Sequence, residues 1–466
     1  MSENIARLLE ASARRFPDKP VLLSGGAALD WTTVEGRAGA VARGLAARGI
    51  GPGDRVAIAM EDPAAVVIAL YGVLKAGATA TPINPRLSAA ERTEILTDLA
   101  PAHVIAAIGE DEAAFPSRDV PGEATSIVLY TSGSTGVPKG VLLSHRATGW
   151  ALASWMGPVM DLRADDVSLA ALPLAHSLGI FGAVLAPLLA GAAVAFVPRF
   201  TPEDAIETIS RRRATVFPGV ATMFQRILES PAFSRAKLAS LRYALSGAAP
   251  CPWELACQWR ERTGVRIVRG YGMTELFRPI SYAAAEETDE ADWIGRAMPG
   301  VDLKVIDDAG AAVACGEAGE LLIRTPGRLT GYLDKPAETR AVLDGDWFRT
   351  GDLAVVSADG FVRIVGRKKD VILRGGYTVA AGEVESVLAA HPDIAEAAVI
   401  GVPHRDLGED VAAFVALRPG AALEPDAVIA YCKSRMASYK YPRQVRIVSE
   451  LPKGPTGKIV KSELRL

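Results

Sequence analysis

A loop rich in glycine and hydroxyl groups, set between two apolar segments, constrains this chain more than any other feature. Residues 131–140 read Thr-Ser-Gly-Ser-Thr-Gly-Val-Pro-Lys-Gly, directly after the apolar run 127–130 and directly before the apolar run 141–143. We expect the flanking runs to pack and hold the loop, which argues against a solvated linker. Amide and hydroxyl donors around a lysine predict a cradle for phosphate oxygens, formed by Thr131, Ser132, Gly133, Ser134, Thr135, Gly136 and Lys139.

This loop differs from the P-loop of common nucleotide hydrolases, which has serine or threonine after the lysine. Here Lys139 is followed by Gly140. The loop therefore predicts a nucleotide-phosphate site of another kind.

The chain length and the order of apolar segments predict a multi-domain α/β protein. At 466 residues the chain is too long for a single core. Strand and helix patterns alternate through about the first 290 residues, which predicts parallel sheets with crossover helices. From Ile294 short strands separated by glycine, aspartate and proline predict a more antiparallel, barrel-like region. We expect a large domain over 1–366 and a small, mobile α+β domain over 367–466.

The composition excludes several classes of function. A net charge of −3 gives no basis for binding nucleic acid or an anionic membrane. Four cysteines without CxxC spacing argue against a disulfide framework or a zinc site and predict a cytoplasmic protein. The N-terminus lacks the pattern of a secretory signal. Residues 178–197 are uncharged, but Pro187 and three glycines interrupt them, so we expect a buried helix, a turn and a strand rather than a membrane span.

Two small-residue or aromatic loops follow predicted strands in the third quarter of the chain. Residues 246–250, Ser-Gly-Ala-Ala-Pro, would let a flat ring lie against the backbone, although a tight turn is the default interpretation. Residues 270–275, Gly-Tyr-Gly-Met-Thr-Glu, offer an aromatic face, a hydroxyl and a carboxylate suited to Mg²⁺. The ends of parallel strands are where open α/β sheets bind ligands. The alternative for Thr274 and Glu275 is a capping pair at the start of a helix.

Two later segments carry charged residues on glycine turns. Asp352, in Trp-Phe-Arg-Thr-Gly-Asp, could accept both hydroxyls of a ribose, or it could be an ordinary turn aspartate. Arg367 would reach the same sugar if the intervening strands form a hairpin. Lys458, in the glycine-rich segment 452–458, is either part of a solvated tail or a mobile charge for a phosphate or carboxylate.

Taken together and in this order, these segments resemble the AMP-forming adenylating superfamily, which includes acyl-CoA synthetases, peptide-synthetase adenylation domains and firefly-type luciferases. The resemblance rests on the phosphate loop, Tyr-Gly-Met-Thr-Glu, Arg-Thr-Gly-Asp, Gly-Arg-Lys-Lys-Asp and Pro-Thr-Gly-Lys, and it runs over nearly the whole chain. It implies a large N-terminal domain of sheets plus a barrel, and a small rotating C-terminal domain.

The resemblance also implies a role for each matched position. The loop 131–139 would hold the β- and γ-phosphates of ATP, and Glu275 would bind Mg²⁺ while Thr274 touches the α-phosphate. Lys458 would bridge the acid's carboxylate and the α-phosphate, and Lys369 would be the hinge of domain rotation. Adenine would lie between Gly247, Ala248, Ala249, Tyr271 and Gly272; Asp352 and Arg367 would hold the ribose; Gly375 and Gly376 would leave a tunnel for the pantetheine of CoA.

The segment 173–179 helps to predict which class of acid the protein binds as substrate. His176 matches the position that gates the acyl pocket in acyl-CoA synthetases, although a lone histidine is more often a core residue. Adenylation domains for amino acids carry an aspartate where Ser177 stands, so a free α-amine would be buried unpaired here. The pocket candidates are Ser177, Gly179, Phe181, Val220 and Met273, with Leu178, Ile180 and Met223 beside them. Their apolar character predicts an aliphatic or aryl monocarboxylic acid.

One departure separates this chain from a dicarboxylate enzyme. The ending Ala-Gly-Glu-Val-Glu after Val379 resembles malonyl-CoA synthetases, but those enzymes carry an arginine where Gly270 stands. Arg269 or Arg278 is a candidate substitute, and a structural ion pair is the commoner role for such an arginine.

The resemblance leaves open both the acceptor of the acyl group and the type of reaction. We expect an acid–CoA ligase that uses ATP, Mg²⁺ and CoA and acts as a monomer or homodimer. The alternatives are an enzyme that loads a carrier protein, a luciferase-like monooxygenase, and a non-catalytic relative. The chain is short for the family before the phosphate loop, and it has no room for the insertion typical of carrier-loading fatty acyl-AMP ligases, which favours CoA.

Overall fold

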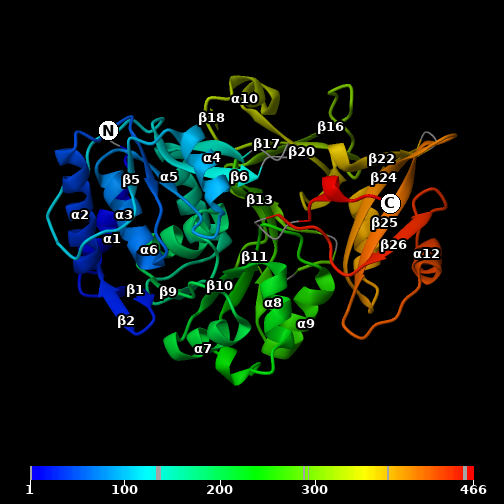
Figure 1. Ribbon diagram of the computed structural model, residues 1–466, viewed down its shortest axis with the longest axis horizontal. Helices are drawn as coiled ribbons and strands as arrows, with labels where there is room; N and C mark the ends of the chain where they lie inside the picture. Colours follow the sequence, from blue (N-terminus) through cyan, green and yellow to red (C-terminus); the bar gives the residue numbers. More distant parts are fainter. Residues whose placement is uncertain (1–2, 133–137, 287–288, 292, 375–376, 455–458) are drawn as a thin grey trace. The chain divides into compact units, whose positions relative to one another are not determined.

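The computed structural model describes residues 3–132, 138–286, 289–291, 293–374, 377–454 and 459–466, and its chain divides into two compact units. The first unit comprises Met1–Asp302 and Arg324–Phe348, and the second comprises Leu303–Ile323 and Arg349–Leu466. Figure 1 colours the chain by residue number, from the N-terminal sheets and helices to the strands of the C-terminal sheet. The predicted domain bounds, 1–366 and 367–466, and rotation about the hinge between them stay predictions.

The first unit contains a seven-stranded sheet in the order β12-β11-β10-β8-β9-β1-β2. All neighbouring pairs are parallel except β1 and β2, as the alternation of strands and helices predicts. The strands are β1 (Pro20–Ser24), β2 (Ala27–Asp30), β8 (Val167–Ala170), β9 (Ala193–Phe196), β10 (Val216–Gly219), β11 (Tyr243–Ser246) and β12 (Arg266–Val268).

A second, six-stranded sheet has the order β18-β7-β6-β4-β3-β5. Its β3–β6 strands are parallel, but β7 turns back antiparallel to β6, and β18 pairs with β7. This is the hairpin that holds the predicted phosphate loop. The strands are β3 (Arg55–Ile58), β4 (Thr79–Pro82), β5 (His103–Ile105), β6 (Thr125–Ser132), β7 (Pro138–Ser144) and β18 (Gly331–Tyr332).

Helices pack against these sheets, and some of them begin at polar caps. Asp62 accepts from the backbone of Ala64 and precedes a helix whose residues from Ala64 to Lys75 are nearly all buried, so that helix lies inside the unit. Helix α2 packs along α3, and α9 packs against α8 and β12 (Figure 1). The helices are α1 (Ala6–Arg15), α2 (Trp31–Ala47), α3 (Pro63–Lys75), α4 (Ala89–Leu99), α5 (His145–Ser154), α6 (Ala186–Ala190), α7 (Pro202–Arg212), α8 (Ala221–Glu229), α9 (Trp253–Thr263) and α10 (Pro336–Val342).

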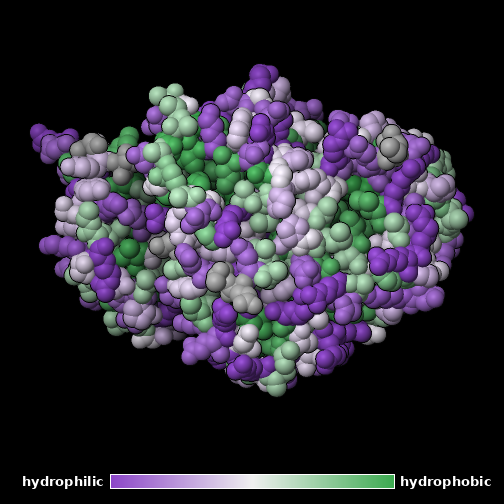
Figure 2. Space-filling view, turned by 180° about the vertical axis from the view of Figure 1, so that it is seen from behind, coloured by the Kyte–Doolittle hydropathy of each residue, from purple (hydrophilic) through white to green (hydrophobic). Residues whose placement is uncertain are grey.

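The uncharged segment 178–197 is buried inside the first unit. It forms the π-helical turn η2 (Leu178–Leu185), α6 and β9, which confirms the predicted helix, turn and strand. Another π-helical turn, η1 (Trp155–Val159), follows α5. In the part of the chain that the structure describes, no helix has the length and hydropathy needed to cross a bilayer. On the face in Figure 2, hydrophobic residues form separate patches among hydrophilic ones.

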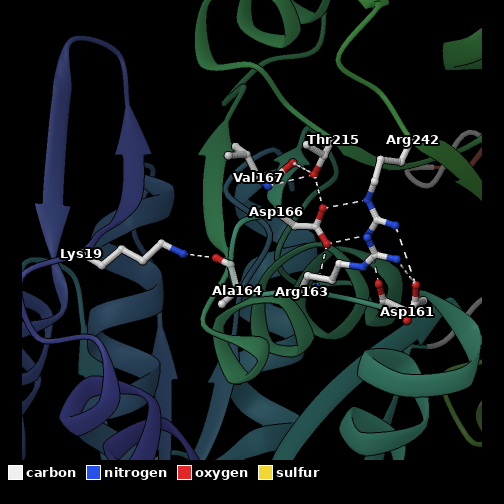
Figure 3. Close-up of polar contacts among 8 residues, drawn as sticks. All are labelled: Lys19, Asp161, Arg163, Ala164, Asp166, Val167, Thr215 and Arg242. Carbon is white, nitrogen blue, oxygen red and sulfur yellow. Dashed lines mark hydrogen bonds and ion pairs between the residues drawn. The ribbon is translucent and has the colours of Figure 1, made fainter.

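A polar cluster around the buried side chain of Asp166 fixes the amino ends of three strands in the parallel sheet (Figure 3). Asp166 precedes β8 and accepts from Arg242 Nη2 at 2.6 Å and Nε at 3.0 Å, and from Thr215 Oγ1 at 2.6 Å. Thr215 precedes β10 and Arg242 precedes β11. Charge-assisted bonds therefore tie the strands at the edge opposite their carboxyl ends, which leaves the carboxyl ends for ligand-binding loops.

Later strands are mostly antiparallel, as the sequence predicts. A three-stranded sheet contains β13 (Gly270–Met273), β14 (Phe277–Ser281) and β15 (Arg296–Ala297). A five-stranded sheet has the order β16-β17-β20-β19 with β21 on β20; its strands are β16 (Asp302–Ile306), β17 (Ala318–Arg324), β19 (Leu343–Asp344), β20 (Trp347–Val356) and β21 (Val362–Arg367).

The C-terminal sheet is separate from the preceding ones and has its own core. Its order is β23-β22-β25-β24, with β26 parallel to β25, and helices α11 and α12 pack with it around buried residues such as Val399 and Val415. The elements are β22 (Val371–Arg374), β23 (Tyr377–Ala380), α11 (Ala381–Ala389), β24 (Ile394–His404), β25 (Gly408–Leu417), α12 (Pro425–Lys433) and β26 (Gln444–Val448). This confirms the predicted small α+β domain.

Candidate active site

The hairpin of β6 and β7 presents the predicted phosphate loop. Thr131 pairs with Lys139, and Ser132 pairs with Pro138, at the last positions before the turn. The two strands are buried between these positions and Ser144, which supports a loop held by packed elements. Gly133, Ser134, Thr135 and Gly136 lie outside the described residues, as does the side chain of Ser132.

Lys139 is linked to the predicted Mg²⁺ ligand through a tyrosine that the sequence did not single out. Lys139 Nζ lies 5.5 Å from the ring centroid of Tyr332, and the Tyr332 hydroxyl donates to Glu275 Oε1 at 3.0 Å. The backbone N–H of Leu329 also donates to the carbonyl of Glu275 at 2.8 Å. The structure therefore brings Glu275 to β18, which pairs with β7, the strand that follows the phosphate loop.

Tyr332 reaches this position because β18 pairs with β7, where Tyr332 lies opposite Val141. Burial, together with the negative charge of Glu275, raises the pKa of Tyr332 above its ordinary value, so the hydroxyl stays protonated and donates to the carboxylate. No local motif marks Tyr332, since its role depends on strand pairing between segments far apart in the sequence.

The acidic site fits a magnesium ion held mainly by ATP. Mg²⁺ is usually bound by one or two carboxylates plus substrate phosphates and water. Among the residues that the structure describes, no group of three or more His, Cys, Asp or Glu side chains could hold a metal ion by itself. Glu275 is half-buried and oriented by Tyr332, which suits a single protein carboxylate beside a polyphosphate.

The Tyr-Gly-Met-Thr-Glu segment is a strand followed by a tight turn, and not a helix start. Tyr271 and Gly272 lie in β13, and Thr274 and Glu275 lie in the turn before β14. The helix-capping alternative is therefore wrong. Gly272 is required sterically, because a Cβ atom there would lie 2.0 Å from the carbonyl oxygen of Phe277, whose own φ is +58°.

The predicted adenine loop follows the carboxyl end of β11, and it carries backbone strain. Gly247 is half-buried, and Ala248 and Ala249 are exposed. Ala248 has a φ of +64°, a left-handed conformation that costs a non-glycine residue about 1 kcal/mol or more. Strain at a strand end, beside small exposed residues, supports a ligand-binding loop.

Arg278 of β14 lies behind this loop. It is 4% exposed and donates from Nη1 to the Ser246 carbonyl at 2.7 Å and from Nη2 to the Val268 carbonyl at 3.2 Å. Burial lowers its pKa from 12.5 to about 9. A Cβ atom at Gly270 would lie 2.5 Å from Nη2, so the guanidinium occupies the space that a side chain at 270 would enter.

Arg269, the other candidate, forms the expected structural ion pair. Its Nη2 lies 2.6 Å from Asp289 Oδ1, and both side chains are 4% exposed.

The acid-pocket candidates gather on and near η2. Ser177 precedes this turn and is half-buried, and His176 is also half-buried, with its carbonyl accepting from Ile180 at 3.0 Å. Gly179 is pressed onto the backbone, because a Cβ there would lie 2.3 Å from the carbonyl oxygen of Pro173. Phe181 is fully buried.

Phe181 packs edge-on to Phe277 at a centroid distance of 4.8 Å, so η2 is in contact with β14, and its part in an acid pocket stays a prediction. Val220, before α8, and Met273 are half-buried.

The ribose candidates form a pair in the second unit. β20 and β21 form an antiparallel hairpin in which Asp352 lies opposite Arg367, as the sequence predicts. Arg367 Nε lies 3.0 Å from Asp352 Oδ1; the aspartate side chain is 5% exposed and the arginine side chain is 52% exposed. The exposed arginine and buried carboxylate could together hold a diol.

The hinge candidate follows this hairpin. Lys369 lies in the short 3-10 turn η4 (Lys368–Asp370) between β21 and β22, although its side chain is outside the described residues. Neighbouring Lys368 pairs with Glu320 at 3.3 Å and Asp308 at 3.1 Å. Gly375, Gly376 and Lys458 also lie outside the described residues.

Comparison with known proteins places this arrangement in one family. The AMP-binding enzyme family matches residues 9–119 and 107–333, and its C-terminal domain matches residues 383–458. The chain therefore belongs to the AMP-binding enzyme family, the adenylate-forming class that the motifs indicate.

Its relatives are acid–CoA ligases that match over nearly their full length. A feruloyl-CoA synthase from Amycolatopsis is 34% identical over 97% of this chain and 96% of the relative. A 3-[(3aS,4S,7aS)-7a-methyl-1,5-dioxo-octahydro-1H-inden-4-yl]propanoyl:CoA ligase from Mycobacterium tuberculosis is 35% identical over 98% of this chain and 97% of the relative. Among solved structures, ATP-bound MatB from Rhodopseudomonas palustris has a TM-score of 0.93 at 30% identity and covers 99% of this chain and 98% of its own.

Proposed function

We propose that this protein is an AMP-forming acid–CoA ligase that activates an apolar monocarboxylic acid. ATP and the acid would give an acyl adenylate and pyrophosphate, and the thiol of CoA would then displace AMP to form a thioester. The observation that carries this proposal is the contact series from Lys139 through Tyr332 to Glu275, which joins a phosphate-loop cation to an oriented carboxylate. The feruloyl-CoA synthase and the propanoyl:CoA ligase named above, both of which form CoA thioesters by name, support the CoA acceptor.

The chemistry requires two anions to approach each other, since a carboxylate attacks the α-phosphate. Bound Mg²⁺ would supply positive charge at the phosphates, with Glu275 as its protein ligand. Lys139 would bind the outer phosphate oxygens, Thr274 would donate to the α-phosphate, and Lys458 would bridge the two reacting groups. Preplaced positive groups of this kind typically contribute about 100- to 1,000-fold in rate.

The half-buried and buried side chains around η2 support the choice of an apolar acid. No carboxylate lies between His176 and Pro198 in the sequence, so an α-ammonium group would have no partner on this segment. His176 would gate the entrance beside Ser177. In the second half-reaction, rotation about Lys369 would bring the segment with Gly375 and Gly376 to the adenylate, where residues without side chains leave space for pantetheine.

The test is pyrophosphate release from ATP and Mg²⁺ with a panel of aliphatic, aryl, dicarboxylic and amino acids, each with and without CoA. We expect release with one class of apolar acid, stimulation by CoA, and formation of the matching thioester. Acid-dependent release that is indifferent to CoA would refute the CoA acceptor and favour a carrier protein. Absence of release with every acid would refute the adenylation activity.

A further inference from the structure

Two buried arginines on neighbouring elements differ in how their charge is compensated. Arg269 and Arg278 are both 4% exposed. Arg269 is paired with Asp289 at 2.6 Å, whereas among the described residues no carboxylate pairs with Arg278. A buried charge is ordinarily paired, because removal from water is costly. Arg278 therefore needs an explanation that a structural ion pair does not give.

The guanidinium of Arg278 has more N–H groups than it has hydrogen bonds to the described residues. Nη1 donates to the Ser246 carbonyl at 2.7 Å, Nη2 donates to the Val268 carbonyl at 3.2 Å, and Nε donates to Ser281 Oγ at 2.9 Å. A guanidinium has five N–H groups, so these three bonds leave one on each Nη atom. These three are the hydrogen bonds that Arg278 makes to the described residues.

A second unsatisfied donor lies beside this guanidinium. Trp155 is 3% exposed, and its Nε1 has no hydrogen-bond partner among the described residues. The Arg278 Cζ atom lies 5.9 Å from the Trp155 ring. Buried donors usually have a hydrogen-bond partner in folded proteins, so the Trp155 Nε1 atom beside a guanidinium with two further N–H groups supports a place for an oxygen acceptor.

The same two side chains border the element that carries the acid-pocket candidates. A Cβ atom at Gly247 would lie 3.0 Å from Leu178 and 3.4 Å from Arg278 Nη1, so these side chains meet at the adenine loop. A Cβ atom at Gly182, within η2, would lie 2.4 Å from the Trp155 ring. The arginine and the indole therefore lie against η2, the element that carries the predicted pocket residues.

We propose that Arg278, assisted by the Trp155 indole, is a specificity-determining residue that binds an oxygen acceptor on the acid, remote from the reacting carboxyl group. The acceptor is a carbonyl on an otherwise apolar monocarboxylic acid, and binding of a second carboxylate instead would replace the monocarboxylic class proposed above. This inference rests on the proposed function, and it narrows the substrate class to oxygenated acids. A site built to hydrogen-bond a substrate oxygen discriminates strongly against the analogue that lacks it.

The experiment compares three acids of equal length: one fully apolar, one with a remote ketone, and one with a remote carboxylate. We expect the wild-type enzyme to prefer one or both oxygenated acids in kcat/KM for pyrophosphate release. Arg278→Met should lower kcat/KM for the preferred acid by about 10- to 100-fold while changing the apolar acid and the KM for ATP by less than about threefold. The ketone and carboxylate arms identify which acceptor is bound.

Controls separate recognition from structural support. Arg296→Met removes an exposed arginine from β15 of the same three-stranded sheet, and it should leave the preference unchanged. Arg278→Lys, which keeps a positive donor, should retain part of the preference. If Arg278→Met does not fold, calorimetric binding of the three acids to the wild-type protein gives the preference directly.

Several outcomes would overturn the inference. If Arg278→Met lowers kcat/KM equally for all three acids, or raises the KM for ATP, then Arg278 only stabilises the structure by joining the ends of β11 and β12. Equal use of the three acids by the wild-type enzyme would mean that water satisfies these donors. In both cases pyrophosphate release persists, so the proposed function stands; loss of release with every acid would instead refute the proposed function.

Discussion

Tyr332→Phe should impair adenylation while leaving the fold intact, because it removes one hydroxyl and keeps the ring. The lost interaction is the 3.0 Å hydrogen bond to Glu275 Oε1. A hydrogen bond to a charged group contributes about 1.5–3 kcal/mol. At about 1.4 kcal/mol per tenfold in rate, this corresponds to about 10- to 150-fold. Both side chains are half-buried, so we expect the lower part of the range, about 10- to 30-fold.

The assay is initial-rate pyrophosphate release as a function of Mg²⁺ concentration at saturating ATP and acid. Loss of the orienting hydroxyl should raise the Mg²⁺ concentration for half-maximal rate, because Glu275 then spends less time in the ligating orientation. Tyr332→Leu should lose a further two- to fivefold, since it also removes the ring beside Lys139.

A matched control comes from the same sheet. Tyr130 on β6 also donates its hydroxyl to a carboxylate, Asp98 Oδ2 at 2.8 Å, and burial similarly raises its pKa. Tyr130→Phe should therefore match Tyr332→Phe in stability but leave the Mg²⁺ dependence unchanged. The reasoning is refuted if Tyr332→Phe retains both the wild-type rate and the wild-type Mg²⁺ dependence while Glu275→Gln is inactive.

Three further predictions test the catalytic lysine, the strand anchor and a buried histidine. Lys458→Ala should slow adenylation about 100- to 1,000-fold but spare thioester formation from supplied acyl adenylate; equal loss in both assays contradicts the two-state scheme. Asp166→Asn should lower the free energy of unfolding in urea by about 1.5 kcal/mol, because it removes the nearer of the two carboxylates that pair with the partly exposed Arg242, with kcat unchanged; a wild-type urea midpoint would show that the cluster adds no stability. Burial lowers the pKa of His145 from 6.5 to about 4, and its Nδ1 accepts from the Ile5 N–H at 3.2 Å. The native state thus resists protonation, so unfolding free energy should fall by about 1.4 kcal/mol per pH unit as pH drops from 6.5 toward 4; His145→Gln should flatten that slope, and an unchanged slope would assign it to other groups.

The sequence alone determined the class of the protein and the order of its parts. Local sequence patterns predicted several features: the strands on either side of the phosphate loop, the Asp352–Arg367 hairpin and the α+β end of the chain. These patterns are apolar runs, turn residues and charged residues close together in the sequence. These features depend on the local spacing of apolar and polar residues, which can be read from the sequence. Whether Lys369 and Lys458 act as hinge and bridge stays a prediction, because no described contact bears on them.

Only the tertiary structure decided which distant groups meet. Tyr332 orients Glu275 because β18 joins the edge of β7, and no pattern around residue 332 contains that pairing. The difference between Arg269 and Arg278 is likewise invisible in sequence, since both are arginines beside the same motif. Folding places a carboxylate against Arg269 and backbone carbonyls against Arg278. Compensation of a buried charge is a property of three-dimensional neighbours, and therefore the acid's recognition had to be inferred from the structure.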